Sequence, residues 1–72
     1  MDSAVNNEAI KAFLEIYSRL SEAARIAKPA EACANAGSVS EGVTVSMDIE
    51  QLIYEAGRLH DAASLLNRLS QA

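Results

Sequence analysis

Few side chains in this sequence have the chemistry of a catalytic or metal-binding residue, and none are spaced as such a site requires. His60 is the only histidine, and histidine is the usual acid or base near neutral pH. Catalysis would also need a positioned nucleophile or a second acid. Metal sites in helical bundles use the spacing Glu-x-x-His, and Gly57 stands where that glutamate would be. We therefore predict no catalytic residue, no metal ion and no cofactor, and we expect that the chain is not an enzyme.

Cys33 is the only cysteine, so it forms no disulfide within the chain and belongs to no CxxC pair. It lies in the stretch EACANAG, which has no dense basic cluster to activate a thiol. We interpret it as a small apolar residue. A single cysteine is typical of a reducing compartment, and the first residues, MDSAVNNEAIKA, do not resemble a secretory signal. We expect a cytoplasmic protein.

Ser46 lies at an expected helix start in the stretch VSMDIEQL. This stretch resembles the helix start of acyl carrier proteins, in which Asp-Ser-Leu opens a helix and the serine accepts a phosphopantetheine arm. The resemblance implies a carrier protein modified at Ser46. The alternative is an ordinary serine N-cap followed by Asp48 and Glu50 in the first turn.

The stretch EAGRLHDAASLL resembles the turn between the paired helices of a tetratricopeptide repeat. The resemblance implies that Gly57 ends one helix and that Ala62 packs the next. One such repeat cannot bury a solenoid core, because at least three are normally needed. We expect instead a continuous helix in which Gly57 costs about 1 kcal/mol relative to alanine.

The composition excludes several classes of function. The 72 residues carry a net charge of −4, and the six basic residues form no stripe. Nucleic-acid binding requires a basic face, and anionic membranes are disfavoured as partners for the same reason. No run approaches the roughly 20 apolar residues of a membrane span. Only 4% of the residues are aromatic, which argues against a base-stacking surface.

Two segments have the apolar spacing of amphipathic helices. In the first, expected over about residues 3–27, the spacing is 3, 4, 3, 4, 3 through Ile10, Phe13, Tyr17, Leu20, Ala24 and Ala27, with Leu14, Ile16 and Ala23 beside them. In the second, expected over about residues 47–70, the same spacing recurs through Ile49, Leu52, Ala56, Leu59, Ala63 and Leu66, with Ile53, Leu65 and Leu69 beside them. Ion pairs are expected on the helix surfaces for Glu8 with Lys11, Glu15 with Arg19, Glu22 with Arg25 and Glu55 with Arg58.

The segment between these helices, about residues 28–45, contains the only proline and two of the three glycines. Pro29 makes Lys28 a poor place to continue a helix. Pro29 and Gly37 would frame a short helix over residues 30–36. We expect Val43 to Val45 to be extended and to lead into the second long helix.

The sequence therefore predicts an all-α fold, a single helical domain over residues 1–72 in which two long amphipathic helices form an antiparallel hairpin. In this antiparallel arrangement, large residues of one helix face small residues of the other, which fills the space between them. We expect Ile49 and Leu52 to pack against Ala24 and Ala27. The same pairing places Ile10 and Phe13 near Ala63 and Leu66.

The apolar faces are wider than one helix can cover, so we expect a non-enzymatic protein-interaction module, such as an adaptor, a small chaperone or a regulator. The expected partner is a second copy, giving a four-helix bundle, because two-fold dimers are the commonest oligomers; another helical protein is the alternative. A small-ligand binder that uses His60 with Tyr17 or Tyr54 is a further alternative, beside the carrier modified at Ser46. The expected core and interface residues are Ile10, Phe13, Leu14, Tyr17, Leu20, Ile49, Leu52, Ile53, Leu59, Leu66 and Leu69.

Overall fold

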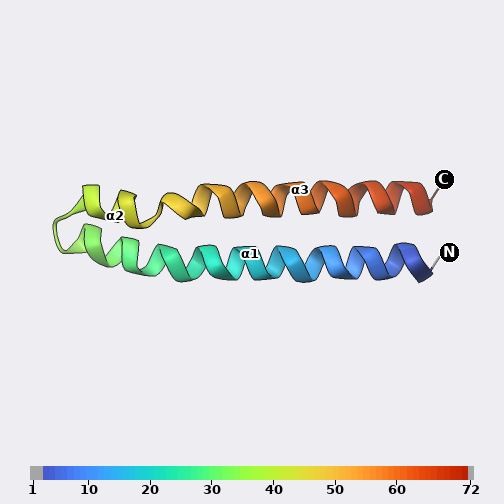
Figure 1. Cartoon of the computed structure of the whole chain (residues 1–72), viewed down its shortest axis with the longest axis horizontal. Helices are drawn as coiled ribbons and strands as arrows, with labels where there is room; N and C mark the ends of the chain where they lie inside the picture. The colour runs from blue at the N-terminus through green and yellow to red at the C-terminus, as the bar shows by residue number, and fades with distance from the viewer. Residues whose placement is uncertain (1–2, 72) are drawn as a thin grey trace.

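The computed structural model describes residues 3–71, and two long helices lie side by side in it along a narrow rod (Figure 1). The chain runs through α1 (Ser3–Asn35), α2 (Val39–Val45) and α3 (Met47–Ser70). The start of α1 and the end of α3 lie at the same tip of the rod, so the two helices are antiparallel. The molecule measures 54 × 14 × 13 Å. The predicted all-helical hairpin is confirmed, and α3 has the bounds that the sequence predicts.

The first helix is longer than the sequence predicts. α1 continues through Pro29 to Asn35, so the predicted end near residue 27 and the separate helix over residues 30–36 are both wrong. Proline removes the amide hydrogen that would bind the Arg25 carbonyl, which ordinarily kinks or ends a helix. Here Pro29 lies on the exposed side of α1, so water can reach that carbonyl. The next turn is held by contacts with α2 through Ala30 and Cys33.

A single left-handed residue reverses the chain at the end of α1. Gly37 has φ +96°, which glycine adopts without steric cost. The amide of Gly37 donates to the Ala34 carbonyl (3.0 Å), and the amide of Ser38 donates to the Cys33 carbonyl (2.9 Å). These two bonds are the Schellman arrangement that satisfies the last carbonyls of a helix. Gly37 is therefore the C-cap residue that the sequence predicts, at the end of the long helix.

The segment before α3 is helical, so the prediction that Val43 to Val45 are extended is wrong. Ser38 caps α2, because its hydroxyl oxygen accepts from the Glu41 amide at 3.4 Å. Gly42 is buried, and a Cβ atom at this position would lie 2.8 Å from the Ala30 carbonyl oxygen. The missing side chain lets α2 approach the backbone of α1. This tertiary contact outweighs the β propensity of the valines.

Ser46 joins α2 to α3 in a turn, with φ −90° and ψ 6°. Its hydroxyl donates to the Val43 carbonyl at 3.0 Å and makes no capping bond to α3. The predicted position of Ser46 before α3 is confirmed, whereas its predicted capping bond is absent. α2 and α3 thus follow each other as one bent helical arm.

The helices pack through small residues. The buried side chains among residues 3–71 are Ala12, Ala23, Ala56 and Ala63. Residues that are buried or half-buried recur on both helices at alternating spacings of three and four, and we call these two rows the inner seam. On α1 the inner seam is Val5, Ala9, Ala12, Ile16, Arg19, Ala23, Ile26, Ala30 and Cys33; on α3 it is Ile49, Leu52, Ala56, Leu59, Ala63, Leu66 and Ser70.

The predicted seam of α3 is confirmed, but that of α1 is wrong by one residue. Every predicted position on α1 follows an inner-seam position, and one residue rotates a helix by roughly 100°. The expected contacts of Ile49 and Leu52 with Ala24 and Ala27 are absent, since both alanines are exposed. Leu52 lies beside Ile26 instead. Two features explain the error: the inner seam of α1 contains a charged residue, Arg19, and the residues that follow its positions have larger apolar side chains.

Candidate interaction surface

The row of residues predicted for the core of α1 forms an exposed apolar surface instead. We call it the outer seam: Ile10, Phe13, Tyr17, Leu20, Ala24 and Ala27. Its four large side chains are exposed by 58% at Ile10, 55% at Phe13, 74% at Tyr17 and 48% at Leu20. They repeat at the spacing of three and four that a second helix recognises. α1 therefore carries two seams, and α3 covers only one.

The outer seam faces the same side of the hairpin as one edge of α3. Phe13 lines a groove between the helices together with His60 and Ser64. Ile53 precedes His60 by one heptad, so it lies in the same column of α3. Ile53 is 54% exposed. The outer seam and Ile53 together form one side of the rod, which we call the apolar flank.

The opposite side of the rod carries the ion pairs of α1, and the exposed Leu65 and Leu69 lie on the same column of α3 as Gln51 and Glu55. Along α1 it carries three ion pairs within one helix, of Glu8 with Lys11 (3.4 Å), Glu15 with Arg19, and Glu22 with Arg25 (Nε to Oε1 3.1 Å). All three pairs are as the sequence predicts. Across the groove, α3 contributes Asp48, Gln51 and Glu55. We call this side the charged flank.

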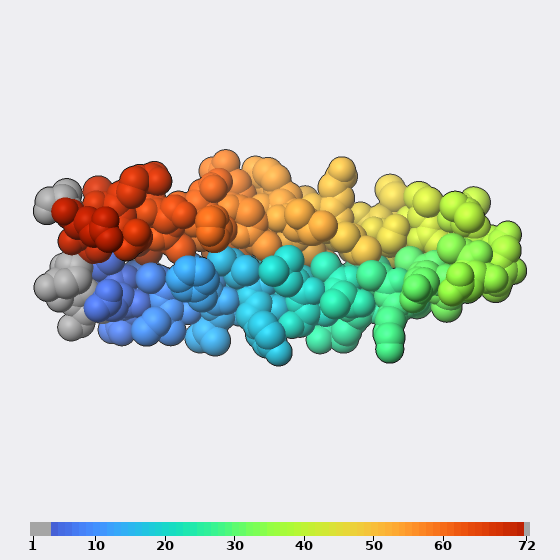
Figure 2. Space-filling view, turned by 180° about the vertical axis from the view of Figure 1, so that it is seen from behind, coloured from blue at the N-terminus to red at the C-terminus, as the bar shows by residue number. Residues whose placement is uncertain are grey.

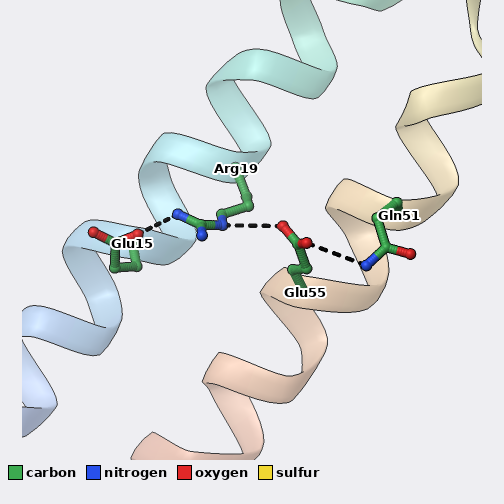
Figure 3. A network of polar contacts seen from close by, with 4 residues as sticks. All are labelled: Glu15, Arg19, Gln51 and Glu55. Atoms are coloured by element: carbon green, nitrogen blue, oxygen red, sulfur yellow. Dashed lines mark hydrogen bonds and ion pairs between the residues drawn. The ribbon is translucent and has the colours of Figure 1, made fainter.

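One polar network links the helices on the charged flank (Figure 3). Arg19 donates to Glu15 on its own helix and, through Nε, to Glu55 Oε1 of α3 at 3.2 Å. Gln51 donates to Glu55 Oε2 at 3.1 Å. The pKa of Glu55 lies below its ordinary value of 4.5, first because of the Gln51 hydrogen bond and second because of Arg19. The predicted ion pair of Glu55 was with Arg58 on the same helix, and this prediction is wrong. Glu55 pairs with Arg19 of α1 instead.

His60 lines a groove between the two long helices. The groove encloses about 310 Å³ and is open to solvent. Among residues 3–71, its walls contain no carboxylate and no thiol, and neither Tyr17 nor Tyr54 reaches it. The structure therefore does not bring together His60 and either tyrosine, which the ligand-binding alternative requires. The lining residues are Val5, Asn6, Ala9, Phe13, His60, Ala63, Ser64, Asn67 and Ser70.

The other residues with reactive groups lie apart from that groove. Cys33 is half-buried near α2, and Ser46 lies at the junction of α2 and α3 with its hydroxyl bonded to the Val43 carbonyl. Within residues 3–71 no three side chains of His, Cys, Asp or Glu are grouped so as to hold a metal ion. α3 runs unbroken through Gly57, so the break that the repeat resemblance implies is absent.

The predicted interface residues divide between the two seams. Ile49, Leu52, Leu59 and Leu66 are half-buried in the inner seam. Leu14 and Leu69 are 63% and 61% exposed, outside the inner seam. Sequence reasoning missed two exposed apolar residues of α2, Val39 (66%) and Val43 (57%), because no helix was expected over this segment. Their spacing of four residues is the signal that could have shown a helix.

The helices do not have the composition of a membrane span. None of those formed by residues 3–71 contains a stretch apolar enough to cross a bilayer.

Comparison with known proteins identifies no relatives for this chain. No protein-family profile matches it, and neither a curated protein nor a solved structure is significantly similar.

Proposed function

We propose that this chain is a non-enzymatic protein-interaction module that binds a helical partner through its apolar flank. One observation carries the proposal: the side chains buried in the hairpin are alanines, whereas the large apolar side chains of the outer seam are 48–74% exposed. Figure 2 shows one face of the rod, on which both long helices run side by side with no further layer over them. Fully burying one such side chain is worth about 1.5–3 kcal/mol.

The distribution of charge supports the same proposal. Between residues 10 and 27 the outer seam contains no charged residue, whereas the ion pairs of α1 lie on the charged flank. A solvent-exposed helix surface would ordinarily carry mixed charges all round. A helix with two apolar seams is typical of a bundle of more than two helices. The module would act as an adaptor, a small chaperone or a regulator, with either a second copy or another helical protein as partner.

The test compares variants of the two flanks as baits. Tyr17→Lys places a charge in the centre of the outer seam, and Ser18→Lys places the same charge one residue away, on the charged side of α1. Neither position is part of the inner seam, so both variants should keep the helical circular dichroism spectrum. We expect purified wild type and Ser18→Lys to capture the same protein from source-cell extract, and this protein can be a second copy of the chain. We expect Tyr17→Lys to lose this captured protein. Identical capture by all three, or by none, contradicts the proposal.

A further inference from the structure

We infer that the outer seam of α1 pairs antiparallel with the outer seam of α1 in a second copy of the chain, around a two-fold axis that passes between Tyr17 and Leu20. This inference rests on the proposed function and names its partner. The observation behind it is the order of residue sizes along the seam. Large side chains occupy the first four of the six positions in the row and the two alanines occupy the last two.

Antiparallel pairing matches large residues with small ones at the outer levels and sets two large residues together at the centre. It places Ile10 opposite Ala27, Phe13 opposite Ala24, and Tyr17 opposite Leu20 of the second copy. Facing layers then interdigitate without voids. A parallel pair would instead set Phe13 against Phe13 and Ala24 against Ala24, crowding one end and leaving cavities at the other. Since the row is complementary to itself only when reversed, it fits the isologous contact of a two-fold dimer.

The border of the outer seam is compatible with the same register. The positions beside it, away from α3, are Asn7, Leu14, Ser21 and Lys28. Antiparallel pairing brings Lys28 next to Asn7 of the second copy and Leu14 next to Ser21. No two like charges face each other along this border. A like-charge contact would oppose assembly, so its absence favours this register.

The outer seam exposes about half of the area that such a dimer uses. If a large side chain has about 200 Å² to bury, the four large residues of the outer seam expose on the order of 450 Å² in each copy. A standard interface uses about 800 Å² per partner. The outer seam therefore supplies about half of this area, and Leu14, Ile53 and the two alanines adjoin it. The row spans about 25 Å along the helix, long enough for several layers of contact.

Cysteine cross-linking tests the register. In a Cys33→Ser background, Ile10→Cys with Ala27→Cys places two thiols about 25 Å apart in one chain, too far for an internal disulfide. In the antiparallel dimer the thiol at position 10 of one copy lies opposite the thiol at position 27 of the second copy. We expect the double variant to form a disulfide-linked dimer under mild oxidation, and each single variant to remain uncross-linked. A dimer formed by Ile10→Cys alone would indicate a parallel pair and overturn the inference.

Sedimentation equilibrium separates this inference from the proposed function. We expect a wild-type dimer whose dissociation constant rises at least tenfold in Tyr17→Lys and is unchanged in Ser18→Lys, with helicity retained in both. The inference is overturned if the wild type is a monomer and the double-cysteine variant forms no cross-link. The proposed function then stands if Tyr17→Lys still loses a captured protein that Ser18→Lys retains, and it fails if the two variants capture alike.

Discussion

The two seams of α1 have the same spacing and opposite contents. The inner seam places Ala12 and Ala23 against α3, and Ile16 and Ile26 are half-buried in the same row. The outer seam, one residue later at each step, carries Phe13 and Tyr17. Small residues allow the two helices of one chain to approach closely, but they remove little apolar area from water. The comparison shows that the hairpin is joined through its small residues and keeps its largest apolar side chains for another contact.

The largest effect is expected from a charge in the inner seam. Ala63→Asp places a carboxylate at a position that is 5% exposed and faces α1, and an unpaired buried charge costs at least about 3 kcal/mol. We expect most of the helical signal to be lost, as measured by circular dichroism during urea titration at fixed protein concentration.

The neighbouring exposed position provides the control for this charge. Ala62→Asp makes the same chemical change outside the inner seam, so it should cost no more than about 0.7 kcal/mol, the difference in helix propensity. Equal losses in the two variants would mean that the inner seam is misassigned.

A smaller effect is expected where α2 approaches α1. Gly42→Ala inserts a Cβ atom 2.8 Å from the Ala30 carbonyl oxygen, so one backbone must move. We expect a net loss of about 1–2 kcal/mol in the free energy of unfolding, typical of overpacking. Thermal denaturation of the variant against the wild type measures it.

Gly57 is the matched glycine on the outer side of α3. A Cβ atom there has nothing within 4 Å, so Gly57→Ala should stabilise the chain by up to about 1 kcal/mol through helix propensity. If Gly42→Ala were equally stabilising, the close approach of α2 to α1 would be disproved.

The smallest effect is expected from the polar network at the edge of the inner seam. Because the pKa of Glu55 is lowered by folding, the unfolded chain binds the proton more tightly. The contribution of Glu55 to stability is therefore complete well above pH 4.5 and is lost as the pH falls through the lowered pKa. Urea titrations of wild type and Glu55→Gln should differ slightly at neutral pH and converge in acid.

Glu31→Gln serves as the control for Glu55, because it removes an exposed carboxylate of α1 that takes part in none of the ion pairs described above. Exposed ion pairs contribute little, so a difference between wild type and Glu55→Gln that grew as the pH fell would contradict the assigned role of Arg19.

The sequence was sufficient for α3 and for the class of fold. Its apolar spacing is unambiguous on α3, where Ile49, Leu52, Leu59 and Leu66 occupy the inner seam as predicted. On α1 two rows have the same spacing, and the row with the larger side chains was predicted to face α3. The occurrence of Arg19 within the inner seam concealed the correct row, because a charged residue is seldom expected there. Only the contact with α3 distinguishes the two rows.

The closed end could not be predicted from local preferences alone. Pro29 and the valines of α2 both have preferences against helix, and both are overruled by packing between segments. The signals that did exist there were local: Gly37 at the helix end, and Ser38 three residues before Glu41, a capping-box spacing. For the candidate surface, the apolar spacing predicted the large residues of the outer seam but assigned them to the side of α1 that faces α3, and it missed the exposed valines of α2.

The tight turn at Gly37 also has a consequence for how the molecule assembles. Gly42 meets Ala30 only 12 residues away in the chain, whereas Val5 and Ser70, which line the same groove, are 65 residues apart. Because the entropy lost on closing a loop grows with its length, the earliest lasting contacts belong to the turn, and pairing then advances towards the chain ends. The pairing of the helices around Val5 and Ser70 is accordingly the last to form and the first to open, which leaves the start of the outer seam, at Ile10, as its least protected portion before a second copy binds.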